Sequence, residues 1–221
     1  MATETRLPRI DPGTTLRGIT WKTYLRLRSN ERNFHVRMSY LDGTLIFMSP
    51  AFIHDRYGRR LGLVVDNVTE ALDIPTQGIA TTTLRLPGDG PRKGTGKEAD
   101  NGFYFRENEP RMRTKDDLVL PDDPPPDLAI EVDHKADSKQ ALQLYARLGV
   151  PELWVYRVRR RLVQFLRLAG EGYEPIDRSL SLPRLTPALV TLALEQAEHL
   201  GETAWKPWLR EWARGLPDPP A

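Results

Sequence analysis

The chain has 221 residues, no cysteine, 39% hydrophobic residues and a formal net charge of +2 at pH 7. A chain of this length and apolar content can bury a sizeable core, so we expect a globular protein. The missing cysteine excludes disulfides, thiolate zinc sites and a cysteine nucleophile, and it fits a reducing compartment. No apolar stretch approaches the roughly 20 residues of a membrane span, and the start of the chain lacks a signal-peptide core. We therefore expect a cytoplasmic protein with no membrane partner, and a charge of +2 is too small to identify a nucleic-acid binder by itself.

The first third of the chain predicts a flexible arm followed by a helix, a hairpin and a second helix. Residues 1–18 are polar and punctuated by proline and glycine. Apolar residues at helical spacing predict a short helix over 21–27. Asp42-Gly43 lies between two alternating apolar runs within 34–48 and predicts an antiparallel hairpin. After it, apolar positions recur at helical spacing over 57–72, which indicates a long amphipathic helix.

The middle and end of the chain predict further strands around two helical segments. β-branched residues favour a strand at 78–86, and the glycine- and lysine-rich residues 87–97 indicate an open, flexible, basic loop. The remaining elements that we expect are strands at 103–105 and 128–132, a helix from 137 that ends at Gly149, strands at 153–156 and 162–168, and a helical, tryptophan-rich stretch at 180–216. The expected organisation is an arm (1–18), one domain (19–200), and a tryptophan-rich helical tail (201–221) that packs on the domain.

Two acidic motifs carry the chemistry that the residues themselves suggest. Glu131 ends the apolar run that begins at Leu128, and a carboxylate in that position needs a partner or a metal. Asp100 lies before the next strand towards the amino terminus. Two carboxylates at the ends of neighbouring strands make a hard oxygen site for Mg²⁺, of the kind that hydrolyses phosphodiesters. The alternatives are a solvated strand end for Glu131 and a turn with Asn101-Gly102 for Asp100.

Several segments together are similar to a known family. They are the Asp42-Gly43 hairpin, Ser49-Pro50 with His54, Glu98-Ala-Asp100 with Phe103-Tyr104, the run from Asp127 to Asp133, and the run from Tyr145 through Glu152 to Trp154. Over roughly residues 34–190 the chain resembles the Uma-type putative restriction endonuclease family of bacteria, a branch of the PD-(D/E)xK nuclease superfamily. The resemblance implies a mixed α/β fold in which helices flank a restriction-endonuclease-like central mixed β-sheet, with the antiparallel hairpin near the amino terminus.

The resemblance also implies a metal site. It makes Asp100 and Glu131 the metal ligands and lets the Val132 carbonyl complete the coordination of Mg²⁺, for which Mn²⁺ is a possible substitute. No organic cofactor is implied.

The chain departs from the family pattern at its lysine. Asp133 stands where the superfamily has lysine, and Ala141 stands where a second lysine position is often filled. Because a cation is needed to position the attacking water and to offset charge on the phosphate, it must come from nearby. Lys139, on the helix after the strand, is preferred over Lys135, which is closer in sequence to Glu131.

Three further residues are candidates for supporting the site. Asp133 and Glu98 lie two residues from Glu131 and Asp100, and His54 opens the long helix. Their alternatives are solvated surface positions.

The leading hypothesis is a metal-dependent DNA endonuclease that acts as a homodimer, because cutting a duplex requires two sites. The first alternative is a binding protein that keeps the nuclease fold without catalysis, and the second is an interaction module that uses the tryptophan-rich tail.

Overall fold

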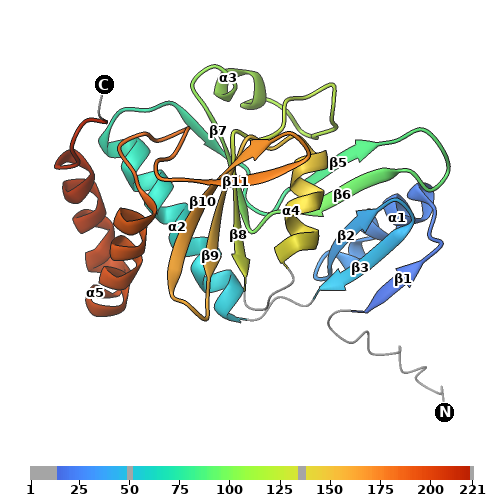
Figure 1. Cartoon of the computed structure of the whole chain (residues 1–221), viewed down its shortest axis with the longest axis horizontal. Coiled ribbons are helices and arrows are strands. Elements are labelled where there is room, and N and C mark those ends of the chain that lie inside the picture. The colour runs from blue at the N-terminus through green and yellow to red at the C-terminus, as the bar shows by residue number, and fades with distance from the viewer. Residues whose placement is uncertain (1–13, 49–51, 134–137, 220–221) are drawn as a thin grey trace, which may run out of the picture.

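The computed structural model describes residues 14–48, 52–133 and 138–219, and it contains two β-sheets side by side (Figure 1). The larger sheet has the strand order β11 (Gly172–Ile176), β10 (Leu162–Ala169), β9 (Glu152–Arg157), β8 (Leu128–Asp133), β7 (Asn101–Phe105) and β4 (Thr76–Gly78). Its two central strands, β8 and β9, are parallel, and the other pairs are antiparallel. The sheet is therefore mixed, as expected.

The smaller sheet is antiparallel throughout and contains the predicted hairpin. Its order is β1 (Thr15–Arg17), β3 (Thr44–Met48), β2 (Arg37–Leu41), β6 (Gly94–Glu98) and β5 (Thr83–Pro87). The turn between β2 and β3 is Asp42-Gly43, and both residues have positive φ, which is the backbone that a tight hairpin turn needs. Strand β1 falls within the region that the sequence places in the arm.

Helices cover both faces of the larger sheet. The helices are α1 (Trp21–Arg28), the 3-10 turn η1 (Glu31–Asn33), α2 (Phe52–Ala71), α3 (Glu109–Met112), α4 (Ser138–Arg147) and α5 (Pro187–Arg214), which is kinked at Gly201. Helices α2 and α5 pack together on one face, and α4 lies on the other, between the two sheets in the view of Figure 1. Helix α1 and strands β2 and β3 form a small core of their own.

The alternation of side chains along β8 assigns its residues to the two faces. Leu128, Ile130 and Val132 belong to the core shared with α2 and α5, whereas Ala129 belongs to the core that contains Tyr145 of α4. Because side chains alternate along a strand, Glu131 follows Ala129 to the α4 side. The carboxylate of Glu131 is thus directed to the space between the sheets.

The structure corrects the prediction for residues 78–97. The expected single strand over 78–86 is two strands, β4 and β5, separated by a turn. The expected flexible loop over 87–97 is wrong in its second half, because β6 is a buried strand in the smaller sheet. The cause is tertiary. A Cβ at Gly94 would lie 2.8 Å from the Trp21 ring, and one at Gly96 would lie 2.3 Å from the Tyr24 hydroxyl, so glycine lets α1 pack directly on this strand.

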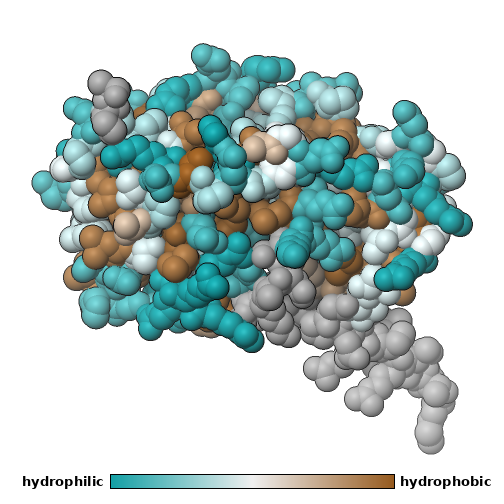
Figure 2. All heavy atoms as spheres, in the orientation of Figure 1, coloured by the Kyte–Doolittle hydropathy of each residue, from teal (hydrophilic) through white to brown (hydrophobic). Residues whose placement is uncertain are grey.

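The tryptophan-rich segment is part of the main core. Trp205 is fully buried, and Trp208 stacks on Trp212 against the same cluster. None of the described helices is long and apolar enough to cross a membrane. On the face shown in Figure 2, hydrophobic and hydrophilic side chains are interspersed.

Candidate active site

The candidate site lies where the chain passes from the smaller sheet to the larger one. Strand β6 ends at Glu98, and after Ala99 and Asp100 the chain enters β7. Asp100 joins the larger sheet by donating its backbone N–H to the Ile130 carbonyl, over 3.1 Å. This crossing brings the side chains of Lys97 and Asp100 to the same end of β8.

Glu131 is held by a lysine and a tyrosine. Lys97 Nζ donates to Glu131 Oε1 at 3.1 Å and to Oε2 at 3.0 Å, and the Tyr145 hydroxyl donates to Oε2 at 2.7 Å. The Lys97 side chain is only 3% exposed, and its Nζ also donates to the Glu98 carbonyl at 2.8 Å. Burial raises the pKa of Glu131, and the charge of Lys97 opposes part of that rise. Burial and the neighbouring Glu131 carboxylate raise the pKa of Tyr145 well above its ordinary value, so Tyr145 remains a donor.

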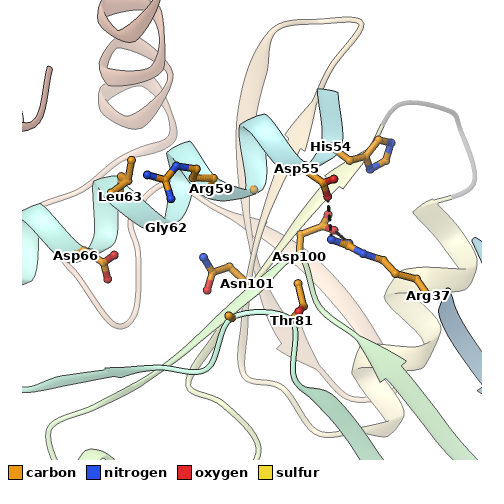
Figure 3. A pocket seen from close by; sticks show the side chains of 12 residues that line it. Arg37, His54, Asp55, Arg59, Gly62, Leu63, Asp66, Thr81, Asp100 and Asn101 are labelled. Carbon is orange, nitrogen blue, oxygen red and sulfur yellow. Dashed lines mark hydrogen bonds and ion pairs between the residues drawn. The ribbon is translucent and has the colours of Figure 1, made fainter. Parts of the chain in front are cut away.

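Asp100 is held by the main chain of β8 and by an arginine. Its Oδ2 accepts the Val132 N–H at 2.7 Å, and its Oδ1 is in ion-pair contact with Arg37 of β2. Arg37 also donates to Asp55 of α2 at 3.1 Å (Figure 3). Burial opposes the charge of Arg37, but the Asp100 and Asp55 carboxylates outweigh it and raise its pKa. Arg37 is therefore a permanent cation between two carboxylates.

The two predicted ligands are neighbours. Asp100 contacts the main chain of Val132, the residue after Glu131, and its charge contributes to the raised pKa of Glu131. Both carboxylates, together with the main chain of Val132, gather at one end of β8.

The other predicted site residues lie in different surroundings. Asp133 forms an ion pair with Arg157 on β9, and Glu98 forms a buried ion pair with Arg28 of α1. His54 lines a cavity beside Asp100. Lys139 is exposed on the first turn of α4, and Lys135 lies outside the described residues. Which lysine serves the site stays a prediction, and Lys97 is a candidate that the sequence analysis missed.

Lys97 was missed because it lies in the segment interpreted as a loop. The sequence feature that could have indicated Lys97 is its position three residues before Asp100. Residues that precede a candidate ligand on a strand often lie close to the same site. The glycines at 94 and 96 concealed the strand.

A buried hydroxyl lies next to this lysine. Tyr40 pairs with Gly96 and Leu41 with Thr95, so the same register continued by one residue places Ser39 opposite Lys97. Ser39 is 2% exposed, and its Oγ has no hydrogen-bond partner within the described part of the chain. A buried polar atom without a protein partner indicates a place for a water molecule or another ligand.

The donor atoms at this end of β8 are oxygens, the type that a hard divalent cation prefers. Mg²⁺ prefers carboxylate and carbonyl oxygens, and Asp100, Glu131 and the Val132 carbonyl supply these. Among residues 14–48, 52–133 and 138–219, no cluster of three or more histidine or acidic side chains suitable for a metal occurs. A cation at this end of β8 would therefore have two carboxylates, those of Asp100 and Glu131, as side-chain ligands from the described residues, and its other donors would be water and main-chain oxygen.

The comparison with protein families decides the family. The model of the Uma2 family, described as a putative restriction endonuclease, matches residues 21–197. The chain belongs to this family. The match confirms the resemblance drawn from the motifs, and membership in the Uma2 family supports a nuclease function.

The comparison with solved structures confirms the fold. The chain is similar to the crystal structure of a putative nuclease belonging to DUF820 from Anabaena variabilis, with 14% identity and a TM-score of 0.53. The similarity covers 79% of this chain and 98% of that one. No curated protein matches the sequence.

Proposed function

We propose that this protein is a metal-dependent endonuclease of the cytoplasm that hydrolyses phosphodiester bonds of DNA, with Asp100 and Glu131 as metal ligands and Lys97 as the catalytic cation. The observation that carries the proposal is the buried contact of Lys97 with both oxygens of Glu131, beside Asp100. It supplies a lysine to a chain that lacks one at residues 133 and 141.

The roles of the residues follow from their contacts. A bound Mg²⁺ would polarise the scissile phosphate and lower the pKa of the attacking water. Lys97, held by Glu131 and the Glu98 carbonyl, presents a fixed positive charge where the phosphate becomes more negative in the transition state. Tyr145 keeps the Glu131 carboxylate in one orientation through its 2.7 Å hydrogen bond. Arg37 lies on the other side of Asp100 and supplies a second fixed positive charge for a phosphate.

A second candidate function is favoured by one observation. Each proposed ligand already has a cationic partner, since Arg37 pairs with Asp100 and Lys97 pairs with Glu131. In a protein that binds nucleic acid without cleaving it, these ion pairs would neutralise the two carboxylates without a metal ion. This candidate predicts nucleic-acid binding with no dependence on Mg²⁺.

Plasmid cleavage separates the two candidates and also tests the lysines. Purified protein is incubated with supercoiled plasmid and with single-stranded DNA in Mg²⁺ or Mn²⁺, with EDTA as a control. Asp100→Asn, Glu131→Gln and Lys97→Met should each lower the cleavage rate by about 10²-fold or more, because each removes a charge that acts on the transition state.

The control is Lys206→Met, which removes a lysine from α5 that pairs with Glu202. It should cleave like the wild type.

Lys139→Met tests the lysine preferred from the sequence: loss of cleavage in this variant, with cleavage kept in Lys97→Met, assigns the role to Lys139. Absence of Mg²⁺-dependent cleavage of either substrate, together with DNA binding that is unchanged by EDTA, assigns the binding function. Because duplex cleavage needs two sites, we also propose a homodimer, which light scattering on the purified protein tests.

A further inference from the structure

A cavity of about 320 Å³ opens beside Asp100, between α2 and the turn at Ala80-Thr81 (Figure 3). Its helical wall contains Gly58 and Gly62, so no side chains from these positions fill the space. A Cβ at Gly62 would lie 2.3 Å from the amide nitrogen of Asn101. The glycine therefore allows the Asn101 side chain to lie directly against the helix.

The two ends of the cavity are lined by different polar residues. Arg37 and Asp100 line the end next to the proposed catalytic site, Asp66 of α2 lines the other end, and Asn101 of β7 lies between them (Figure 3). A volume near 300 Å³ is the lower limit of the range that pockets for small organic molecules occupy. A single nucleotide unit is of suitable size.

Two polar groups in this cavity have unused hydrogen-bonding capacity. Asn101 Oδ1 accepts the N–H of Gly102 at 2.9 Å, which fixes the amide and leaves its Nδ2 to donate elsewhere. Within the parts of the chain that the structure describes, Asn101 Nδ2 donates to no protein group and the Asp66 carboxylate has neither an ion pair nor a hydrogen bond. Asp66 is an exposed residue, so its carboxylate faces water when no ligand fills the cavity, and desolvation by the neighbouring protein raises its pKa.

We propose that this cavity is a nucleobase subsite that prefers guanine in the nucleotide next to the cleaved phosphate. The proposal rests on the proposed function, because the phosphate of that nucleotide is placed at Asp100. An ionised carboxylate only accepts hydrogen bonds, and guanine alone among the DNA bases offers two adjacent donors, N1–H and the N2 amino group, to one carboxylate. The Asn101 amide donates to an acceptor, which guanine has at O6 and N7.

The geometry of the cavity limits the form of the substrate. In a duplex, N1–H and one N2 hydrogen of guanine are paired with cytosine, so the base must be unpaired or rotated out of the stack to reach Asp66. The preferred substrate is therefore single-stranded DNA or a locally opened duplex with guanine beside the cleaved bond.

Binding of short oligonucleotides tests the subsite without cleavage. The full-length protein in EDTA is titrated into fluorescent twelve-residue thymidine oligonucleotides that carry one central guanine, hypoxanthine, adenine, cytosine or thymine. Fluorescence anisotropy gives the affinities. The wild type should bind the guanine oligonucleotide about tenfold more tightly than the all-thymine one, and hypoxanthine, which lacks the N2 amino group, should fall between them.

Two matched variants of α2 make the test specific. Asp66→Ala and Glu70→Ala each remove one negative charge from the same helix, but only Asp66 lines the cavity. Asp66→Ala should bind guanine and thymine oligonucleotides within about twofold of each other, whereas Glu70→Ala should keep the preference. Asn101→Ala should lower the guanine preference through the other polar group.

Two results would overturn the subsite. In one, the wild type binds the five oligonucleotides equally; in the other, Asp66→Ala keeps the preference for guanine. Either result leaves the proposed nuclease standing if cleavage still depends on Asp100 and Glu131. Conversely, a guanine preference that depends on Asp66, in a protein that never cleaves, supports the subsite and removes the nuclease function.

Discussion

Replacing Lys97 with methionine provides a direct measure of the buried ion pair at the centre of the site. The change removes the amine and keeps a side chain of similar length, so Glu131 retains only the Tyr145 hydroxyl as a hydrogen-bond partner among the contacts described. Breaking a buried pair by removing one partner costs about 3–5 kcal/mol. Because the Glu131 side chain is 17% exposed, we expect the lower end of this range. In a domain of this size, that corresponds to a fall of roughly 6–12 °C in Tm.

The cost should depend on pH. Burial already raises the pKa of Glu131, and losing Lys97 removes the charge that opposes this rise. A carboxyl whose folded pKa lies above its unfolded value contributes stability that is present below the unfolded pKa and is lost as the pH rises through the folded pKa. The destabilisation caused by Lys97→Met should therefore be larger at pH 8 than at pH 5.

Urea unfolding in EDTA, followed by tryptophan fluorescence, measures the effect for Lys97→Met, Glu131→Gln and the double variant. Since the two side chains are in contact, the double variant should lose less free energy of unfolding than the two single variants added together, by more than about 1 kcal/mol. Lys206→Met, which breaks an exposed pair, should cost less than about 1 kcal/mol. Additive single effects, or a cost for Lys97→Met no larger than that for Lys206→Met, would refute the reasoning.

Three further predictions concern other parts of the chain. Gly96→Ala should destabilise the protein by about 1–3 kcal/mol in urea unfolding, because its Cβ would lie 2.3 Å from the hydroxyl of the fully buried Tyr24, and near-wild-type stability would contradict the packing. Glu152→Gln should lower the free energy of unfolding by about 1–3 kcal/mol. The buried Glu152 carboxylate accepts the indole N–H of Trp154 at 2.8 Å and the backbone N–H of Ser181 at 2.9 Å, and the glutamine amide would place a donor against one of these donors. An unchanged midpoint of urea unfolding would contradict this. Arg59 lowers the pKa of Glu202 to about 2. The small stabilising effect of this exposed pair should therefore be present above pH 4.5 and disappear as the pH falls towards 2. NMR titration of the Glu202 carboxyl should show the lowered midpoint, and an ordinary midpoint would exclude the pair.

The sequence was sufficient for those parts of the fold that depend on local patterns. The hairpin at Asp42-Gly43 follows from the turn residues, and α2 follows from the helical spacing of its apolar residues. Asp100 and Glu131 could be paired in advance because each lies at the end of a strand that enters the same sheet. The family resemblance then supplied the mixed character of the central sheet and the helices that flank it. The order of the strands was not predicted and comes from the structure.

The positions that local patterns could not reveal have tertiary causes. Gly94 and Gly96 suggest a loop by themselves, and only the rings of Trp21 and Tyr24, far away in sequence, explain why glycine belongs in a buried strand. Misinterpreting this strand hid Lys97. Arg37 was hidden for a similar reason, since it lies on the hairpin and reaches Asp100 only because the two sheets lie side by side.

The same misinterpretation explains why the lysine was sought only among the residues that follow Glu131. Searching the residues that follow Glu131 assumes that the cation comes from the same strand or the next helix, which led to Lys139 and Lys135. Lys97 instead arrives from the smaller sheet, on the segment that leads into Asp100. The amine of a lysine on a different strand thus contacts the same carboxylate, which is why Lys97 is proposed for the role of the missing lysine. If Lys97 has this role, the smaller sheet is part of the active site, because its strands β2 and β6 supply both cations that contact the two carboxylates.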